Sequence, residues 1–104
     1  MPIPDFQRVM LPLLQHTLDK KEHNLSETED HLAQLFKLTQ DERNEMLSSG
    51  KQTRFSNRVG WAKQHLVKAG LLESPRRSVF QISERGGQAL SKKPDRIDMV
   101  FLKH

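Results

Sequence analysis

Cysteine is absent from this chain of 104 residues, and so is any long apolar run. Without cysteine there can be no disulfide and no cysteine-ligated zinc, a composition that suits a reducing compartment such as the cytoplasm. The apolar cluster at residues 9–14 is too short and too interrupted for a membrane span, and no basic leader precedes it. We therefore expect a cytoplasmic protein with neither a membrane anchor nor a signal peptide.

Signatures of catalysis and of cofactor binding are missing as well. The chain has five histidines, none of them four residues from another: His16, His23, His31, His65 and His104. They thus lack the helical spacing typical of metal ligands, and no glycine-rich loop of the phosphate-cradling type occurs. The pair Asp5 and Asp19, the latter followed by two lysines, imitates a nuclease pattern. Both acids fall in a predicted helix, whereas that chemistry needs carboxylates and lysine on adjacent strands around a metal. The sequence predicts no catalytic residue, no metal and no cofactor.

What the chain does have is an uneven distribution of charge. Residues 1–50 carry five Lys/Arg against nine Asp/Glu, a net charge of −4, whereas residues 51–104 carry twelve against four, a net charge of +8. No acidic residue lies between Lys51 and Leu72. An acidic partner such as nucleic acid is expected to meet this basic second half.

The length favours a single domain, which we place at residues 1–93, followed by a tail or the start of a linker at 94–104. Apolar residues at helical spacing and capping signals predict five helices. The first helix runs from about 5 to 20, where Pro12 implies either a kink or a later start. The others run from a capping box at Ser26 through Leu38, from a second box at Thr39 through Leu47, from 54 to 69, and from Ser83 to just before Pro94.

Short extended segments separate the helices. There is room for a very short piece near Asn24, and two strands, residues 71–73 and 78–82, are predicted to form a hairpin with a loop at 74–77. Gly70 ends the preceding helix as a left-handed cap. The alternation of apolar residues after Pro94 predicts a strand laid on the domain or the start of a linker. The fold class is mainly α with a small β-hairpin, a winged helix-turn-helix.

The helix at 54–69 presents an apolar face to the core and a polar face to the outside. The polar face collects Asn57, Gly60, Gln64 and Lys68, with Arg54 and Trp61 at its margin. Asn and Gln can hydrogen-bond to adenine edges and Arg to guanine edges in the major groove, and this helix has no carboxylate to repel phosphates. The alternative interpretation is an ordinary core helix with a solvated polar side.

The hairpin supplies the second half of the predicted interface. Arg76 and Arg77 at its tip suit phosphates or the minor groove, although turns are commonly polar for simpler reasons. Trp61 is expected to pack, half-buried, against the first helix or the wing rather than to stack on a base. Arg58 suits either a phosphate or an acidic residue of a neighbouring helix. The predicted DNA-binding residues are thus Arg54, Asn57, Arg58, Trp61, Gln64, Lys68, Arg76 and Arg77.

Three segments carry a resemblance to a known family: residues 54–62 (RFSNRVGWA), 66–72 (LVKAGLL) and 83–86 (SERG). With them the chain resembles the N-terminal winged-helix domain of Mrr-type restriction proteins, the type IV class directed at modified DNA. The arrangement of Arg-x-x-Trp-Ala before Leu-x-x-Ala-Gly-Leu is moderately specific, whereas the Ala-Gly-Leu and Ser-x-x-Gly frame recurs in many winged helices. The likeness extends from Phe6 to about Leu102.

The resemblance implies a DNA-reading part of a restriction system, either as a fragment or as a stand-alone module. In that family the nuclease is a separate C-terminal domain, so no nuclease activity is expected of these residues. Double-stranded DNA, plain or methylated, is the implied partner, and sensitivity to methylated bases is implied by the family alone. Two alternatives stay open: a small transcriptional regulator of the same fold, and a winged helix used as a protein-interaction module.

Overall fold

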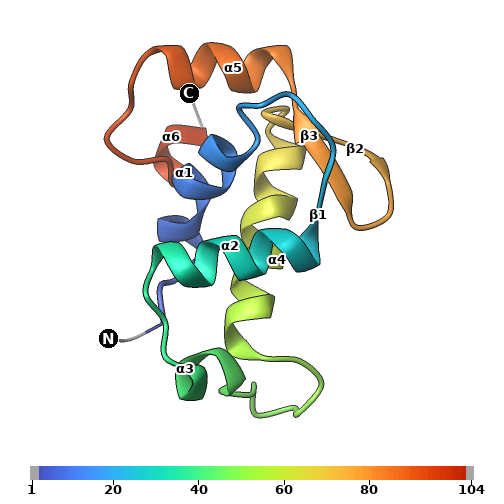
Figure 1. Ribbon diagram of the computed structural model, residues 1–104. Coiled ribbons are helices and arrows are strands. Elements are labelled where there is room, and N and C mark those ends of the chain that lie inside the picture. Colours follow the sequence, from blue (N-terminus) through green and yellow to red (C-terminus); the bar gives the residue numbers. More distant parts are fainter. Residues whose placement is uncertain (1–2, 103–104) are drawn as a thin grey trace.

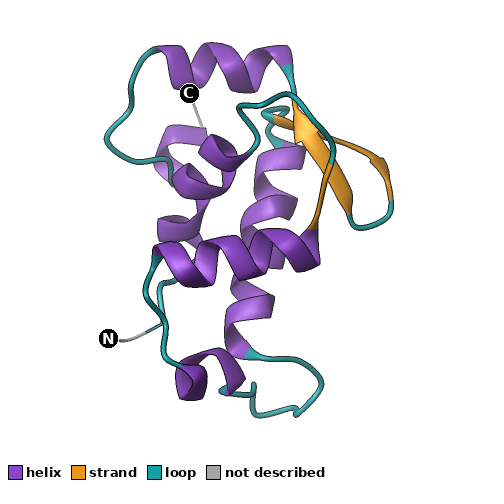
Figure 2. Cartoon of the chain, in the orientation of Figure 1, coloured by secondary structure: helices purple, strands orange, loops and turns teal. Residues whose placement is uncertain are grey.

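The computed structural model describes residues 3–102, which form a helical domain with a small sheet at one side (Figure 1). The helices are α1 (Phe6–His16), α2 (Leu25–Leu35), α3 (Gln40–Asn44), α4 (Arg54–Lys68), α5 (Glu84–Ser91) and α6 (Met99–Leu102). The strands are β1 (His23–Asn24), β2 (Leu72–Arg76) and β3 (Val79–Ile82). All three strands are antiparallel in the order β1-β3-β2, and Figure 2 shows the β2–β3 hairpin projecting beyond the helices. The predicted fold class is confirmed.

The first helix is shorter than its apolar pattern predicted. The Asp5 carboxylate accepts a hydrogen bond from the Arg8 N–H at 2.9 Å and caps the N-terminus of α1. The helix continues through Pro12 but ends at His16. There the Thr17 hydroxyl donates to the Leu14 carbonyl at 2.7 Å, and Lys20 then adopts a left-handed φ of 64°. This turn allows the chain to double back into β1.

The start of α2 corrects the prediction of a capping box at Ser26. The cap is Asn24, whose side chain accepts from the Glu27 N–H at 2.8 Å. Pairing with the sheet explains the shift, because Asn24 lies opposite Val79 and the next N–H, that of Leu25, donates to the Ser78 carbonyl at 3.1 Å. The strand thus passes directly into the helix, and Ser26 lies inside it.

The second capping box is confirmed. The Thr39 hydroxyl accepts from the Glu42 N–H at 3.1 Å, and the Glu42 carboxylate accepts from the Thr39 N–H at 2.8 Å. The helix that it opens, α3, is shorter than predicted and ends at Asn44. It stops there because Met46 forms an isolated antiparallel bridge with Thr53, which closes the loop leading into α4.

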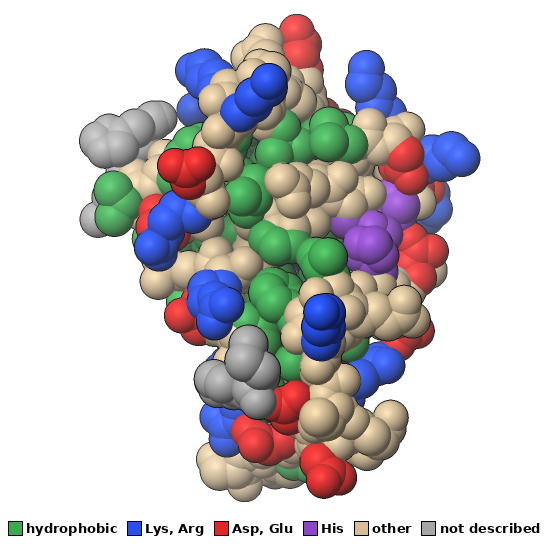
Figure 3. All heavy atoms as spheres, turned by 60° about the vertical axis from the view of Figure 1, so that its left-hand side comes forward, with side chains coloured by type: hydrophobic (Ala, Val, Ile, Leu, Met, Phe, Trp, Pro, Cys, Tyr) green, Lys and Arg blue, Asp and Glu red, His purple; other side chains and the backbone are tan. Residues whose placement is uncertain are grey.

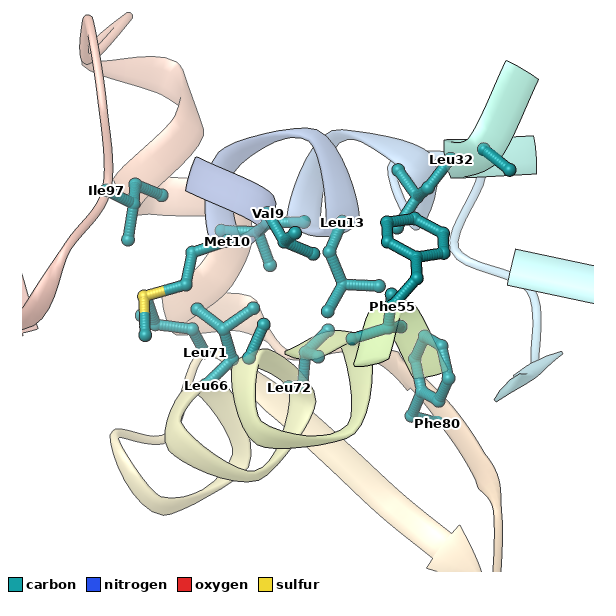
Figure 4. Close-up of a cluster of buried hydrophobic side chains, with 14 residues drawn as sticks. Val9, Met10, Leu13, Leu32, Phe55, Leu66, Leu71, Leu72, Phe80 and Ile97 are labelled. Carbon is teal, nitrogen blue, oxygen red and sulfur yellow. The ribbon is translucent and has the colours of Figure 1, made fainter. Parts of the chain in front are cut away.

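The core lies between α1 and α4, and the sheet and the C-terminal segment close its two ends. Figure 4 shows side chains of α1 and α4 pointing toward each other, with Phe80 of β3 at one end and Ile97 at the other. Phe80 and Ile97 are both fully buried. The helix α4 has the predicted bounds to within one residue, and Gly70 follows it at a left-handed φ of 82°, as expected.

The hairpin differs from the prediction in the length of its first strand. β2 continues through Arg76 with an irregular register after Glu73, and the turn that follows contains Ser78 at φ 62°. The Ser74 hydroxyl donates to the Val79 carbonyl at 2.8 Å across the hairpin. Pro75 is tolerated within β2 because this strand is an edge of the sheet, where a missing N–H breaks no ladder.

The segment after Pro94 forms a short helix where alternation predicted a strand or a linker. Asp98 starts α6, since its carboxylate accepts from the Phe101 N–H at 3.0 Å, and the Met99 N–H donates to the Gln7 side chain of α1 at 3.1 Å. Ile97 enters the core, so the described part of this segment packs on the domain. Among residues 3–102, no helix is long and apolar enough to cross a membrane.

Candidate nucleic-acid interface

One face of α4 is left open by its packing. The helix begins where the Thr53 hydroxyl accepts from the Ser56 N–H at 3.1 Å. Its apolar residues Phe55, Val59, Ala62 and Leu66 are buried. On the other side Gln64 and Lys68 are exposed, and Asn57 and Gly60 are half-buried. The structure thus brings the four predicted polar-face residues together on the outer side of the helix.

A shallow hollow of about 320 Å³ lies on this face. It is lined by Gln52, Asn57, Gly60, Trp61 and Gln64. A Cβ atom added to Gly60 would meet nothing within 4 Å, so this glycine leaves open space rather than room for a packed neighbour. Gln52, which precedes the helix, was not among the predicted residues. It joins the hollow because the loop before α4 closes on itself, where the Leu47 N–H donates to the Gln52 carbonyl at 3.0 Å.

Trp61 lies farther out than expected. Its side chain is 53% exposed, and its ring is tilted against that of His65 one turn along the same helix, at 5.9 Å between centroids. Packing against the first helix or the wing was expected, whereas the ring contact that the structure gives is on α4 itself. The indole thus forms part of the wall of a hollow that is otherwise lined by amides and a glycine.

Two predicted arginines of α4 have partners within the fold. The Arg54 Nε donates to the Glu45 carboxylate at 2.6 Å, and both side chains remain partly exposed. The Arg58 guanidinium donates to the carbonyls of Ile3 at 2.9 Å and Pro4 at 3.3 Å. Arg58 therefore braces the segment before α1, through backbone carbonyls rather than through the acidic partner that was the alternative from sequence.

The wing carries its two arginines at the surface. Arg76 is 63% exposed and its guanidinium lies 2.5 Å from the Glu22 carboxylate, in the loop that precedes β1. Arg77 follows in the turn, and across residues 3–102 it takes part in no ion pair. The two adjacent arginines thus differ, because one is held by an acid and the other is exposed without one.

A cluster of histidines is a feature that spacing alone missed. His16 of α1 lies 4.4 Å from His23 of β1 and 4.3 Å from His31 of α2, measured between ring centroids. Burial, followed by the nearby rings of His23 and His31, lowers the pKa of His16. Burial alone would lower the pKa of His23 too, but hydrogen bonds to the carboxylates of Asp19 and Glu27 outweigh it and raise that pKa.

The nuclease-like pair of acids has other roles in the fold. Asp5 caps α1, and Asp19 lies in the turn after α1 rather than inside the helix as predicted. A hydrogen bond from the His23 ring at 2.8 Å lowers the pKa of the Asp19 carboxyl. Both carboxylates thus serve local structure.

Comparison with known proteins places these features in one family. No curated protein and no solved structure shows a significant match to this chain. The family model described as the Mrr N-terminal domain matches residues 6–92, which include α1 through α5 and the whole wing. That match spans most of the chain and covers every residue predicted to contact DNA. The chain therefore belongs to the Mrr N-terminal domain family, a part of Mrr restriction proteins.

Proposed function

We propose that this domain binds double-stranded DNA, with the exposed face of α4 in the major groove and the wing against phosphates. The observation that carries the proposal is the amide-lined hollow on a basic, acid-free helix. Base edges are assigned to Asn57, Gln64 and Lys68, and phosphates to Arg54, Arg76 and Arg77.

The chemistry of the hollow supports DNA over a protein partner. A protein-docking surface would be expected to present a contiguous apolar patch, whereas Trp61 is the one apolar side chain among the five residues of this wall. Asn57 and Gln64 carry both donors and acceptors on one amide, which suits the paired N6 and N7 positions of adenine. The missing side chain at Gly60 lets a base edge or a sugar approach the helix backbone.

The ion pairs of Arg54 and Arg76 do not oppose this role. Both pairs are partly exposed, and ion pairs of that kind contribute only about 0–1 kcal/mol. A phosphate can therefore replace Glu22 or Glu45 at little cost while the arginine stays in place. Arg58 is assigned a positioning role instead, because its two carbonyl partners anchor the chain before α1.

Within a restriction system this domain would select the DNA and a nuclease domain elsewhere in the protein would cut it. That division follows from the family, whose restriction activity is directed at modified DNA. Methylated duplexes are therefore the first ligands to compare with plain ones. A transcriptional regulator of the same fold would show a preference for a sequence without any dependence on methylation.

A salt titration of DNA binding tests the proposal directly. The four basic side chains assigned to the duplex, Arg54, Lys68, Arg76 and Arg77, should give a slope of log K against log salt of about −3 to −4, since each neutralised phosphate contributes about −0.9. Fluorescence anisotropy with labelled duplexes, plain and methylated, measures this slope. A slope near zero, or no binding at low salt, would overturn the proposal and favour the protein-interaction alternative.

A matched pair of double variants distinguishes the contribution of the wing to DNA binding from the effect of net charge. Arg76→Gln with Arg77→Gln should flatten the slope by about two. Lys92→Gln with Lys93→Gln removes the same two charges from exposed positions at the end of α5 and should leave the slope almost unchanged. Equal slopes for the two double variants would show that the wing is not a contact.

The absence of nuclease activity is tested by incubating the protein with methylated and unmethylated plasmid in Mg²⁺ or Mn²⁺. We expect intact plasmid, because metal-assisted cleavage needs acidic ligands that converge beside the scissile phosphate. Cleavage that disappears in Asp5→Ala or Asp19→Ala protein would show that these two acids form a nuclease site after all.

A further inference from the structure

The histidine cluster joins three elements that are separate in sequence. His16 ends α1, His23 is the first residue of β1, and Glu27 lies in the first turn of α2. Figure 3 shows histidine side chains gathered in one patch with acidic side chains beside it. The fold thus creates by tertiary contact a grouping that the spacing of the histidines did not predict.

The donor atoms of these three residues converge. One ligand atom from each lies within 4.8 Å of the others. His23 Nδ1 is 2.5 Å from Glu27 Oε1, and His16 Nε2 is 3.8 Å from the same oxygen. The histidine side chains are 15% and 10% exposed, whereas Glu27 is 51% exposed and covers the group from outside.

A buried ring nitrogen of His16 points to a ligand at this cluster. The Nε2 atom is buried and, among residues 3–102, no group forms a hydrogen bond with it. A buried polar atom without a partner destabilises the folded state, and such atoms are uncommon in folded proteins. The separation of 3.8 Å between His16 Nε2 and the Glu27 carboxylate oxygen is too long for a hydrogen bond.

Asp19 holds the ring nitrogen of His23 that faces away from Glu27. Its carboxylate oxygens lie 2.8 and 3.0 Å from His23 Nε2, while His23 Nδ1 faces the cluster. A carboxylate that holds the second ring nitrogen of a metal-bound histidine fixes the tautomer and the orientation of the ring, and it increases the basicity of the ligand. The chain places that carboxylate four residues before the histidine.

We propose that His16 Nε2, His23 Nδ1 and the Glu27 carboxylate bind one divalent transition-metal ion, with zinc as the best match. Two imidazoles and one carboxylate are ligands that zinc accepts at about 2.0–2.2 Å in tetrahedral geometry, with a solvent molecule at the fourth position. Magnesium and calcium prefer oxygen ligands alone. Binding would replace the direct contact of 2.5 Å between His23 Nδ1 and Glu27 Oε1 by two bonds to the ion.

The ion would link three elements of the fold. It joins the end of α1 and the start of α2 to β1, and β1 pairs with β3 of the wing, where His23 lies opposite Phe80. Binding would therefore stabilise the connection between the helical part and the sheet. This inference is independent of DNA contact, since none of its residues is assigned to the DNA interface.

Calorimetric titration of the tag-free chain with ZnCl₂, with MgCl₂ in parallel, tests the site. We expect one zinc per chain at micromolar or tighter affinity, a melting temperature that rises with zinc concentration, and no response to magnesium. Absence of zinc binding would overturn the proposal, and so would an equal response to both metals.

Variants decide whether the bound ion occupies this cluster. Glu27→Gln should weaken zinc binding at least tenfold and Asp19→Asn by about 10–100-fold, while His65→Gln, which removes a histidine outside the cluster, should bind zinc as the wild type does. His23→Gln should abolish binding. Circular dichroism in EDTA establishes that each variant is folded, and the exposed Glu27 gives a test that does not depend on the buried ring. Unchanged zinc affinity in Glu27→Gln and Asp19→Asn would overturn the assignment.

Discussion

Two helical glycines of this domain have opposite surroundings. Gly86 lies in the seam where α5 packs against the start of the sheet, and Gly60 lies on the open face of α4. A Cβ atom on Gly86 would lie 2.1 Å from the Leu71 carbonyl oxygen, whereas a Cβ atom on Gly60 would meet nothing within 4 Å. Packing requires the first glycine. The second lowers helix stability and packs against no described neighbour, and its open space is where we propose that DNA approaches α4.

The polar side chains of the two regions also differ, in whether their hydrogen bonds are made within the fold. In the seam, the Ser83 hydroxyl donates to the Gly70 carbonyl at 2.5 Å and accepts from the Gly86 N–H at 3.0 Å, so its hydrogen-bonding capacity is used inside the fold. On the open face, Gln64 and Lys68 are exposed. A polar residue that the fold has already satisfied contributes to stability, and one left at the surface can contribute to recognition.

The largest expected effect comes from Gly86→Ala. The added methyl group would clash with the backbone of Leu71, which cannot move aside like a flexible side chain, so we expect a loss of about 3 kcal/mol, or roughly 15 °C in melting temperature. Gly87→Ala is the matched control on the next residue of α5, where a Cβ meets nothing within 4 Å, and it should be neutral or slightly stabilising. Equal melting temperatures for the two variants would contradict the close approach at the seam.

A second prediction concerns recognition by the open face. Gln64→Ala should change the preference among duplexes by about 1–3 kcal/mol if its amide makes a bidentate contact to a base, with little change in melting temperature because the side chain is exposed. Competition binding with a panel of duplexes measures the preference. Arg77→Ala is the comparison, since a phosphate contact should weaken all duplexes alike. A change of preference in the wing variant alone would reverse the assigned roles.

Gly60→Ala tests stability and DNA affinity in the same variant. Alanine favours the helix over glycine, so the free energy of unfolding should rise by about 0.5–1 kcal/mol. The same methyl group would intrude on a closely approaching DNA, and affinity should fall roughly fivefold or more. Thermal melting and anisotropy on the same sample measure both effects. A variant that gains stability and keeps full affinity would show that DNA does not come close to α4 at this position.

The smallest effect is expected at the exposed capping box of α3, away from both regions. The backbone hydrogen bond from Thr39 lowers the pKa of the Glu42 carboxyl below its ordinary value. A carboxyl whose pKa is lower in the folded than in the unfolded state stabilises the folded protein at pH values above the unfolded-state pKa. This stabilisation is lost as the pH falls through the folded-state pKa. Chemical denaturation of wild type and Glu42→Gln should therefore differ at pH 7 and converge in acid.

Asp41→Asn is the control for that measurement, because it removes the same charge from the same turn and leaves the Thr39 and Glu42 bonds intact. A difference between wild type and Glu42→Gln that stays constant down to low pH would contradict the ionic part of the cap.

Local signals predicted the elements whose boundaries depend on neighbouring residues. The Thr39 box, the α4 helix and the Gly70 stop were all predicted correctly, because a cap or a left-handed turn involves atoms only a few residues apart. Boundaries set by distant partners were missed. The start of α2 depends on the pairing of Asn24 with Val79, and the α6 helix depends on contact with α1 through Gln7.

The same distinction applies to the functional surface. The sequence by itself determined a basic second half, an acid-free helix with amides on one face, and a hairpin with two arginines, since charge and helical phase follow directly from residue order. Only the tertiary structure decided that Arg58 binds backbone carbonyls, that Arg76 meets Glu22, and that Trp61 stands at the surface. It also brought His16 and His23 together across a turn, because the ring positions depend on how α1, β1 and α2 pack rather than on their spacing along the chain.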